Sequence, residues 1–513
     1  MSNATEFQDT KHRAASKTRR SLVSSRAVNG SAKTDNPWAE LKTISARAHG
    51  AYRDNLIAGA AIGRMQTNIV GTGIAARPVV DFKALGITEE AAKLLNEELA
   101  RHYDAWAEDA NECDIDRTLD FYQQQGLGLI SCLLGGDVFC STPNVKFNGA
   151  KYDLKLQLIE GERIANKDGV ANTKMLHDGV EFGAFGAAPV KYHIRTASPA
   201  DDAIEGKPTW DILDAFGAET GRRRVLHLFE KTRPGQVRGV SFLAPILEPL
   251  QLLDKWGSAE LAAAVVGSML THFIERDQAG DGGPAFDTPE GGEAAQDQQP
   301  ALALEGATVV DMAPGEKINS VSSAHPSPNF DPFFQSIVKS IGARIQIPLD
   351  ELMLHYQSSY SAARAAMLQA WRFFRVRRGW LIQAFCQPLY ELLIDELVAT
   401  GKVNLPGYAE NRAAYCAAHW IGDGRGAMDE LKEAQAMAAR VALGVSNLDM
   451  ETMQSSGKSY EEVLRGRAKE IALQDELGVR DSTREPLVQQ AVFTPAPEQK
   501  PAETPSKTDE NAQ

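Results

Sequence analysis

Cysteine is scarce in this sequence, and its scarcity excludes two kinds of scaffold. The 513 residues include five cysteines, an odd number, and no two of them are spaced as C-x-x-C. This pattern argues against a disulfide framework and against a zinc knuckle. We therefore expect reduced thiols, as in the cytosol.

Long hydrophobic runs are also missing. The longest, LAAAVVGSMLTHFI at 261–274, is shorter than the roughly 20 apolar residues that a helix needs to cross a bilayer. The N-terminal stretch MSNATEFQDTKHRAASKTRR lacks the apolar core of a signal peptide. We expect neither a targeting segment nor a membrane segment.

Positive charge is in deficit. The chain has 54 Lys and Arg against 68 Asp and Glu, a net charge of -14. Nucleic-acid binding normally shows as a basic patch or a basic domain, so the molecule as a whole should repel phosphate backbones. Any contact with DNA should be local or weak.

Motifs of catalysis and metal binding are absent from the sequence as well. No serine stands in G-x-S-x-G, no cysteine has a recognisable local signature, and H-E-x-x-H does not occur. His177, His193 and His227 lie in separate predicted turns or strands, without the paired spacing of metal ligands. We expect structural histidines, no catalytic residue, no cofactor and no metal.

Two stretches imitate nucleotide-binding motifs. Gly71, Gly73 and Ala76 have the G-x-G-x-x-A spacing after a strand-like NIV, but Pro78 and two valines favour extended chain where that fingerprint requires a helix. We expect a tight turn there. SSGKSY at 455–460 lacks the first glycine of a phosphate loop, because Thr452 stands in its place, so we expect a solvated helix start.

The length of the chain predicts two to four domains between polar tails at 1–36 and 481–513, which we expect to be disordered. In the first half, apolar spacing predicts helices at 37–66, 88–110 and 118–134. Alternating or β-branched runs then predict strands at 138–142, 154–160, 179–183, 189–195 and 223–230.

The second half is predicted to be mainly helical. Residues 242–276 have helical spacing, 277–300 are rich in Gly, Pro, Asp and Gln and must be loop, and short strands are predicted at 308–312 and 317–322. A helix at 333–346 is ended by Pro348. The polar stretch 349–361 follows, and we expect Leu352, Met353 and Leu354 to anchor it. The longest helix, 361–399, should kink at Pro388, and helices at 427–442 and 459–475 complete the body.

Several stretches in a fixed order resemble one protein family. HLFEKTRPGQVRGVSFLAPIL (227–247) resembles the signature of the portal proteins of lambda-like tailed phages. Further stretches resemble other segments of that family: RDNLIAGAAIGRMQTNIVGTGI (53–74), WAEDANECDIDRTLDFYQQQ (106–125), LLGGDVF (133–139), QSSYSAARAAMLQAW (357–371) and IGDGRGAMDELKEAQA (421–436). In the last of them Glu430 replaces the usual proline. The resemblance covers roughly residues 50–445.

The resemblance implies an α+β portal fold, assembled as a ring usually of twelve subunits. Its expected parts are a mixed α/β wing, a helical stem, a small β-containing clip insertion and a helical C-terminal part. The segmentation above places them as follows: wing, 37–241; first stem helix, 242–276; clip insertion, 277–328; second stem helix, 329–347; channel loop, 348–360; long wing helix and crown, 361–480.

The function that the resemblance implies is a channel at one capsid vertex. Terminase packages double-stranded DNA through it, DNA is ejected through it, and it connects head and tail. The implied partners are further copies of the chain, the terminase large subunit, capsid and scaffolding proteins, head-completion proteins and the DNA itself, in the virion and, during assembly, in the host cytoplasm. Two alternatives are a structural head or connector protein that passes no DNA, and a nucleotide-binding enzyme that uses residues 71–76.

The resemblance also suggests roles for single residues. His355, Tyr356, Gln357 and Ser358 should line the narrowest part of the channel. Arg233 and Arg238 either clamp a phosphate or pair with carboxylates within the wing or on a neighbouring subunit, and pairing is favoured. Arg372, Arg375 and Arg378 share a helix face and could meet a neighbour's carboxylates, DNA or solvent, of which the first is favoured.

Overall fold

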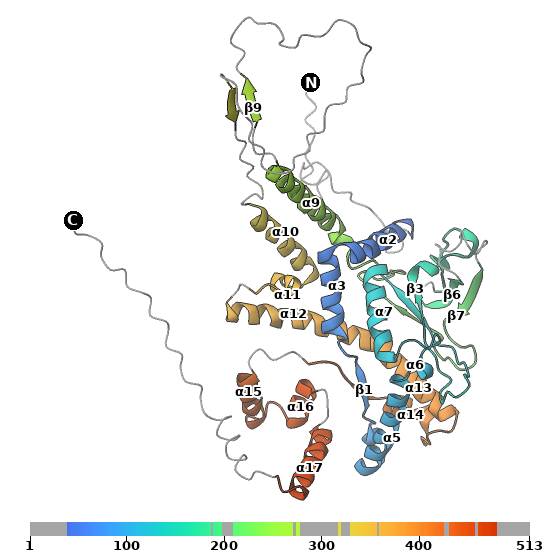
Figure 1. Ribbon diagram of the computed structural model, residues 1–513. Helices are drawn as coiled ribbons and strands as arrows, with labels where there is room; N and C mark the ends of the chain where they lie inside the picture. Colours follow the sequence, from blue (N-terminus) through green and yellow to red (C-terminus); the bar gives the residue numbers. More distant parts are fainter. Residues whose placement is uncertain are drawn as a thin grey trace, which may run out of the picture. The chain divides into compact units, whose positions relative to one another are not determined.

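The computed structural model describes residues 38–185, 188–196, 209–269, 273–276, 316–319, 329–356, 359–424, 430–456 and 460–479 (Figure 1). The chain divides into two compact units. One comprises residues 1–45, 62–241 and 359–513, and the other comprises residues 46–61 and 242–358. The terminal tails, and with them the prediction of disorder, lie outside the described residues.

Helices of the first unit meet around a buried aromatic cluster. Tyr103 and Trp106 come from α5 (Glu89–Ala107), and Phe121 begins α7 (Phe121–Gly135). The ring of Phe121 lies 5.1 Å from Trp106 and 5.7 Å from Phe385. Tyr390 of α13 (Gln387–Ala399) contacts Tyr103 edge-on at 5.8 Å. All five side chains are fully buried. The cluster therefore packs the helices near residues 103–121 against the helical segment at residues 385–390.

The described strands of the first unit form three small antiparallel sheets. In one, β2 (Val138–Ser141) lies between β3 (Gln157–Glu160) and β8 (Val225–Leu228). The second is a meander of β4 (Leu176–His177), β5 (Val180–Phe182), β6 (Pro189–Arg195) and β7 (Trp210–Asp214). The third pairs β1 (Ala75–Pro78) with β11 (Ala418–Ile421). Four of these strands, β1, β4, β7 and β11, were not predicted from the sequence.

The long helix of the first unit is interrupted by a π turn. α12 (Tyr360–Leu381) leads into a π-helical turn at Ile382–Cys386, and α13 follows with Pro388 in its first turn. The wide turn accommodates a proline ring that would otherwise clash with the preceding helical carbonyl. The irregularity expected at Pro388 is therefore present, as a π turn just before it.

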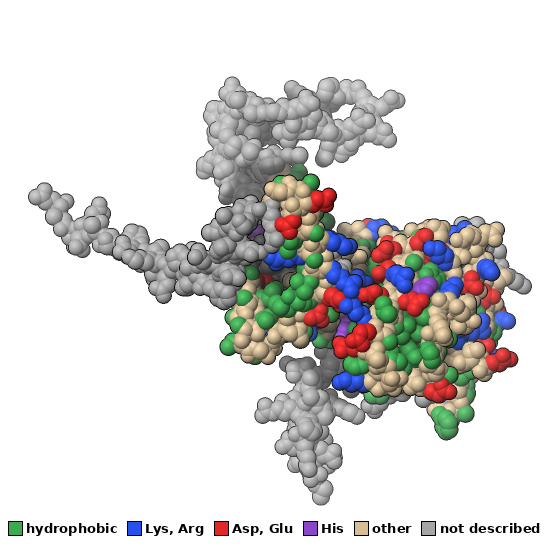
Figure 2. Space-filling model, turned by 90° about the horizontal axis from the view of Figure 1, so that it is seen from below, with side chains coloured by type: hydrophobic (Ala, Val, Ile, Leu, Met, Phe, Trp, Pro, Cys, Tyr) green, Lys and Arg blue, Asp and Glu red, His purple; other side chains and the backbone are tan. Residues whose placement is uncertain are grey.

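Six further helices lie in the described part of this unit. They are α4 (Phe82–Leu85), α6 (Ala110–Cys113), α14 (Tyr408–Tyr415), α15 (Glu430–Ala442), α16 (Leu448–Ser456) and α17 (Tyr460–Glu476). On the face seen in Figure 2, acidic and basic side chains are interspersed and hydrophobic side chains reach the surface in patches.

The second unit contains α9 (Leu247–Met269), α10 (Phe330–Ile345), α11 (Leu349–Met353) and an antiparallel pair of strands, β9 (Phe273–Arg276) and β10 (Glu316–Asn319). Trp256 of α9 stacks on Phe330 of α10, with 4.6 Å between the ring centroids. The helix expected over 242–276 therefore stops earlier, and its last residues form a strand. The strand expected at 308–312 lies outside the described residues.

Asn55 divides the helix expected at 37–66. α2 (Trp38–Asp54) ends before it, and α3 (Leu56–Ile69) begins after it. The side-chain oxygen of Asn55 accepts a hydrogen bond from the Ala58 amide at 2.8 Å, and its amide group donates to Asp254 at 2.7 Å. Asparagine is a favoured helix cap, so the chain starts a new helix here.

Candidate functional site

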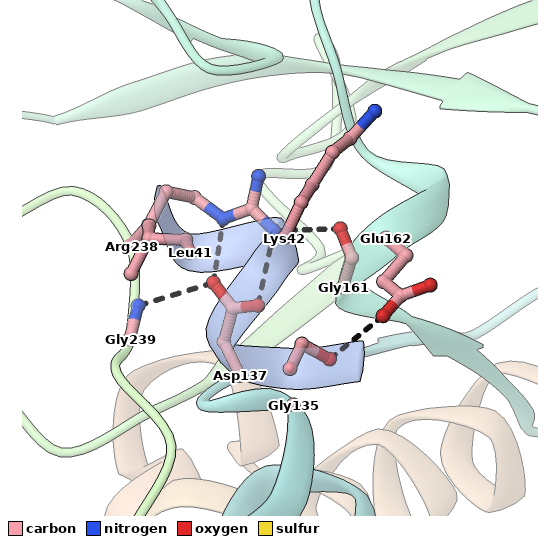
Figure 3. A pocket seen from close by; sticks show the side chains of 9 residues that line it. Leu41, Lys42, Gly135, Asp137, Gly161, Glu162, Arg238 and Gly239 are labelled. Carbon is pink, nitrogen blue, oxygen red and sulfur yellow. Dashed lines mark hydrogen bonds and ion pairs between the residues drawn. The ribbon is translucent and has the colours of Figure 1, made fainter. Parts of the chain in front are cut away.

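Arg238 is held by bonds within its own subunit. Its guanidinium donates to both carboxylate oxygens of Asp137, at 2.6 and 3.0 Å, and to the carbonyl oxygen of Gly161 at 2.6 Å (Figure 3). It also donates to the carbonyl oxygens of Ile164 and Asp178, both at 2.9 Å. These five bonds use the full donor capacity of an arginine. All five N–H groups of Arg238 are thus engaged within the subunit, and none remains to donate to a phosphate.

The Asp137 carboxylate is the centre of this buried cluster. Besides Arg238 it contacts the Nε2 atom of His227 at 3.1 Å and accepts from the Gly239 amide at 3.2 Å. Burial alone would raise the pKa of Asp137, but the Arg238 charge and the hydrogen bonds lower it well below its usual range. Burial lowers the pKa of His227, which therefore favours the neutral ring. The cavity beside the cluster, about 10 Å³ in volume, has room for roughly one water molecule.

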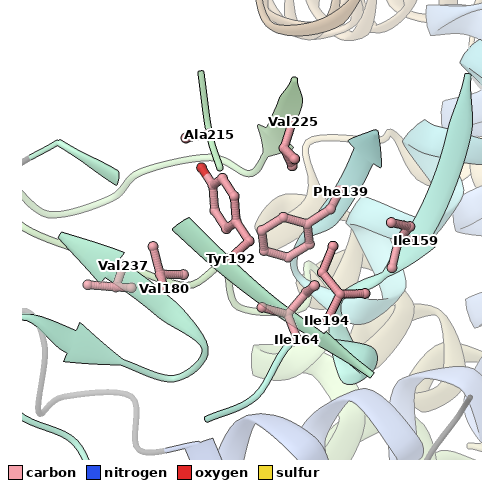
Figure 4. Close-up of a cluster of buried hydrophobic side chains, with 9 residues drawn as sticks. All are labelled: Phe139, Ile159, Ile164, Val180, Tyr192, Ile194, Ala215, Val225 and Val237. Atoms are coloured by element: carbon pink, nitrogen blue, oxygen red, sulfur yellow. The ribbon is translucent and has the colours of Figure 1, made fainter. Parts of the chain in front are cut away.

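The hydrophobic core of the β-rich region fixes the loop on its other side. Val237, the residue before Arg238, belongs to a buried cluster with Phe139, Tyr192 and Ile194 (Figure 4). The Arg238 guanidinium lies 5.4 Å from the centre of the Phe139 ring. Val237, which is apolar, and Arg238, which is charged, thus anchor consecutive positions of this loop.

The rest of the loop is closed by Gln236. Its side-chain oxygen accepts from the Thr232 amide at 2.8 Å, and its amide group donates to the Arg238 carbonyl at 2.9 Å. Gln236 is buried, whereas Lys231 and Arg233 are exposed. Gln236 and Asp137 both belong to the stretches that carried the resemblance, but only the cations of the loop are conspicuous in the sequence.

The glycine-rich stretch that imitates a dinucleotide site is a tight turn, as predicted. It follows the end of α3 rather than a strand. Gly71 has a φ of 63°, and the Thr72 amide and hydroxyl donate to the two carboxylate oxygens of Asp423 at 2.8 and 2.7 Å. Gly73 has a φ of 131°, and a Cβ there would overlap Tyr122. These glycines are required by the turn and by close contacts.

The three arginines of α12 do not act alike. Arg378 donates to the carbonyl oxygens of Ile69, Asn68 and Asp423 at 2.7, 2.9 and 2.8 Å and so caps the end of α3. Arg372 and Arg375 are exposed. Within the described residues these two have no hydrogen-bond or ion-pair partner.

Each of the three histidines lies beside a carboxylate. His177 is 2.8 Å from Asp178, His193 is 2.7 Å from Glu181, and His227 pairs with Asp137. The carboxylates thus lie within hydrogen-bond distance of the three rings. No group of three or more metal-ligating side chains occurs in the part of the chain that the structure describes. All five cysteines are buried and free.

The expected channel loop is only partly within the described residues. His355 and Tyr356 are exposed, and Gln357 and Ser358 lie outside the described residues. The Tyr356 hydroxyl donates to Glu351 at 3.1 Å. Leu352 is buried, as expected, but Met353 and Leu354 are 38% and 56% exposed, which corrects the expectation that they anchor the loop. The reason is that α11 is a single short helix, with one face toward the core, and Leu354 follows it at a φ of 52°.

No described helix is both long enough and apolar enough to cross a membrane.

Comparison with known proteins identifies a family. The family model described as "Phage portal protein, lambda family" matches residues 18–378. Portal protein B of Escherichia phage lambda and the portal protein of Escherichia phage N15 are each 26% identical over 453 residues, covering 83% of this chain and 83% of theirs. The probable portal protein of Halomonas phage phiHAP-1 is 21% identical over 455 residues, covering 86% of this chain and 83% of its own.

Solved structures with a similar chain come from gene transfer agent particles. A chain in the neck of the native particle, determined with C12 symmetry, gives a TM-score of 0.41 at 12% identity and covers 81% of this chain and 93% of its own. A chain in the neck of the empty particle, determined with C6 symmetry, gives 0.38 at 13% identity and covers 79% and 92%.

Proposed function

The chain belongs to the lambda family of phage portal proteins, and from that premise we propose that it forms a ring of twelve subunits at one vertex of a capsid. Double-stranded DNA is packaged and ejected through the ring. The observation that carries this proposal is the family match over residues 18–378, which spans elements of both units. We propose no catalytic role for the protein.

We assign the parts of the subunit as follows. Residues 37–241 form the wing, and 361–480 form the long wing helix and crown. Residues 242–276, which contain α9, and residues 329–347, which contain α10, form the two arms of the stem, with a clip at 277–328 between them. The strand β9 at the end of the first arm pairs with β10 of the clip. The order of α9, the β9–β10 strand pair and α10 along the chain supports this assignment.

The channel loop is assigned to residues 348–360, with His355, Tyr356, Gln357 and Ser358 at its narrowest point. α11 and α12 fix the two ends of this segment. The four side chains are polar, and none carries a permanent positive charge. Such a surface suits sliding, because each phosphate that a cation neutralises adds salt-dependent affinity and so resists movement. The net charge of -14 supports the same idea.

The proposed function implies several partners: the terminase large subunit, the major capsid and scaffolding proteins, and head-completion proteins. The expected location is the capsid vertex of the virion, after assembly in the host cytoplasm. We propose the clip as the docking surface for terminase and for the later connectors.

The proposed ring can be tested by measuring its mass and by imaging it. Twelve copies of the 55.7 kDa chain have a mass of roughly 670 kDa by light scattering, and closed cyclic rings with a central channel should appear by electron microscopy. A stable monomer at micromolar concentration and physiological salt, with no rings in the micrographs, would contradict the proposal. Rings with a channel too narrow for a DNA duplex would favour a structural head protein instead.

A further inference from the structure

One large cavity of the first unit lies along α12. Its volume is about 1030 Å³, and α12, α15, α16 and residues 420–424 line it. The α12 wall presents Arg364, Leu368, Trp371 and Arg375, which follow the three-and-four spacing of one helix face, together with Arg372. The cavity is large enough for a short peptide segment and is too large for a single ion.

The charges of this cavity are unbalanced. Arg364, Arg372 and Arg375 have no hydrogen-bond or ion-pair partner within the described residues. Across the cavity, Arg440 is already neutralised by Glu451, with a contact of 2.7 Å. The cavity is lined by five arginines in all and by three carboxylates, Asp423, Glu433 and Glu451, and this leaves a net charge of +2. The excess positive charge lies on α12 and attracts negative charge. Leu368, Trp371 and Met437 add apolar surface to the same walls. An occupant must therefore offer both carboxylates and apolar side chains.

The end of α17 has these properties. Residues 472–479 are all exposed, including Leu473 and Leu477 at 54% and 63%. Glu470, Leu473, Glu476 and Leu477 lie three and four residues apart and so share one face. The face thus alternates carboxylates with leucines.

The position of Glu476 is unfavourable for the stability of α17 by itself. α17 has no basic residue in its last turn, where Glu476 stands. Negative charge near a helix C-terminus opposes the helix dipole, typically by 0.3–1 kcal/mol. The helix nevertheless has a regular C-terminal cap. The Val479 amide donates to the Gln474 carbonyl at 3.0 Å, and Gly478 has a φ of 63°. A cationic partner would remove this cost.

We propose that the C-terminal half of α17 from a second copy of the chain docks in the α12 cavity. Glu470 and Glu476 then meet Arg364, Arg372 and Arg375, while Leu473 and Leu477 pack against Leu368 and Trp371. This inference rests on the proposed ring. Because the two surfaces differ, the contact is heterologous, and repetition around a closed ring satisfies every subunit.

The subunit's own α17 is not the occupant. None of the described side chains of α17 lines the cavity. Its first half is attached to α5 through Lys93 with Glu461 and through Arg465 with Glu97 at 3.4 Å. This attachment leaves the second half exposed.

A cysteine cross-link tests the contact between chains. Tagged subunits carrying Leu368→Cys are co-expressed with untagged subunits carrying Leu473→Cys, and rings are oxidised and separated without reductant. We expect a disulfide-linked dimer of one tagged and one untagged chain. The matched control is Ala468→Cys, which is exposed on the opposite side of α17 and should give little dimer. The five native cysteines are buried and should not interfere.

Charge reversal tests the electrostatic part. Arg372→Glu with Arg375→Glu should raise the protein concentration needed for half-assembly about tenfold at low salt, and Glu470→Arg with Glu476→Arg should do the same. Combining all four substitutions should restore assembly. Arg53→Glu is the control, because Arg53 pairs locally with Asp54 on an exposed surface.

The outcomes separate the inference from the proposed ring. Intact rings without the dimer, a cross-link within one chain, or charge reversal without an effect on assembly would overturn the α17 contact and leave the ring in place. If Arg372→Glu with Arg375→Glu leaves assembly unchanged but weakens binding of a DNA duplex, the cavity binds nucleic acid instead, and the inference is wrong. If the unmodified protein forms no ring, the proposed function itself fails.

Discussion

Arg238 and Asp137 form a bidentate buried ion pair although 101 residues separate them in the sequence. Asp137 directly precedes β2, and the other bonds of the guanidinium reach carbonyl groups near β3, β4 and β6. One side chain therefore joins the loop after β8 to both larger sheets of the first unit. Arg238 therefore holds this loop against the β-rich part of the first unit, whereas Lys231 and Arg233 are exposed.

Breaking this pair should be costly for stability. Arg238→Ala leaves a buried carboxylate without its charge partner, and Asp137→Asn leaves a buried guanidinium, so each should lower the free energy of unfolding by about 3–5 kcal/mol. Urea denaturation followed by circular dichroism measures the loss. Arg53→Ala, which removes an exposed pair, should leave the midpoint unchanged. Equal midpoints for Arg238→Ala and the unmodified chain would show that the pair contributes nothing.

Stability should also fall on mild acidification. Burial lowers the pKa of His227 below its value of about 6.5 in an unfolded chain, so its stabilising contribution is present above that pH and is lost as the pH decreases. The lowered pKa of Asp137 acts in the same direction, but only below about pH 4. The urea midpoint should therefore fall from pH 7.5 to pH 5.5.

His227→Gln should flatten this pH dependence, because glutamine can donate to Asp137 without titrating. His102, whose pKa is also lowered by burial, is more exposed to solvent, and His102→Gln should have the smaller effect. A midpoint that rises as the pH falls would reverse the predicted sign.

A pair of glycines separates backbone strain from close contact. Gly71 and Gly86 both have positive φ, 63° and 65°. A Cβ at Gly86 meets nothing within 4 Å, so Gly86→Ala should cost only the backbone strain, about 1–2 kcal/mol. A Cβ at Gly71 would overlap the Asp423 carboxylate that binds Thr72, so Gly71→Ala should cost clearly more in the same denaturation assay.

The extra cost at Gly71 should shrink in an Asp423→Ala background, where the overlap is relieved. Equal losses for Gly71→Ala and Gly86→Ala would mean that the Asp423 contact is unimportant.

The sequence predicted most helices of the fold because their apolar spacing is local information. It missed β1 and β11, which pair Ala75 with Ile421, since each is only four residues long and β1 ends in proline. The break at Asn55 had a local signal in its preference for helix caps, but a continuous apolar pattern concealed it. Length and periodicity reveal long elements, whereas short ones depend on partners far along the chain.

The candidate sites show the same limit. Arg238 was singled out because a fixed cation in an acidic chain is conspicuous, but its partner Asp137 could be identified only from the fold. Arg372 and Arg375 were grouped with Arg378 by spacing, yet Arg378 binds three carbonyl groups and the other two do not. Arg364 was not considered, because it lies eight residues before Arg372 and joins the same cavity only through the helix face.

Deleting residues 280–298 tests the clip assignment. This stretch contains five acidic residues and no basic residue, and its composition is too polar for a core of its own. We expect the helical content of the subunit to be unchanged by circular dichroism, while terminase binding is weakened. Unimpaired packaging of DNA by particles that contain only the deleted form would refute the assignment.

The last prediction concerns sliding of DNA past the proposed channel loop. Tyr356→Lys with Gln357→Lys adds two cations per subunit to a segment that has no permanent positive charge between His355 and Ser358. For each phosphate that an added cation binds, the slope of log affinity against log salt concentration becomes steeper by about 0.9. Ring assembly should be intact, because the described residue of the pair, Tyr356, is exposed. Packaging or ejection should slow, and the effect should be largest at low salt, where charges are least screened.

A neutral control separates charge from loss of the tyrosine. Tyr356→Phe with Gln357→Asn removes the hydrogen bond from the Tyr356 hydroxyl to Glu351 but adds no cation, so DNA should move at the normal rate. The rate is measured by nuclease protection of packaged DNA at a series of salt concentrations. Because Glu351 is 6% exposed and within reach of position 356, a lysine there can be partly neutralised, and Gln357→Lys alone should account for most of the slowing. Normal packaging by the lysine variant at every salt concentration, or an experimental ring structure with this segment on the outer wall, would rule out the channel assignment.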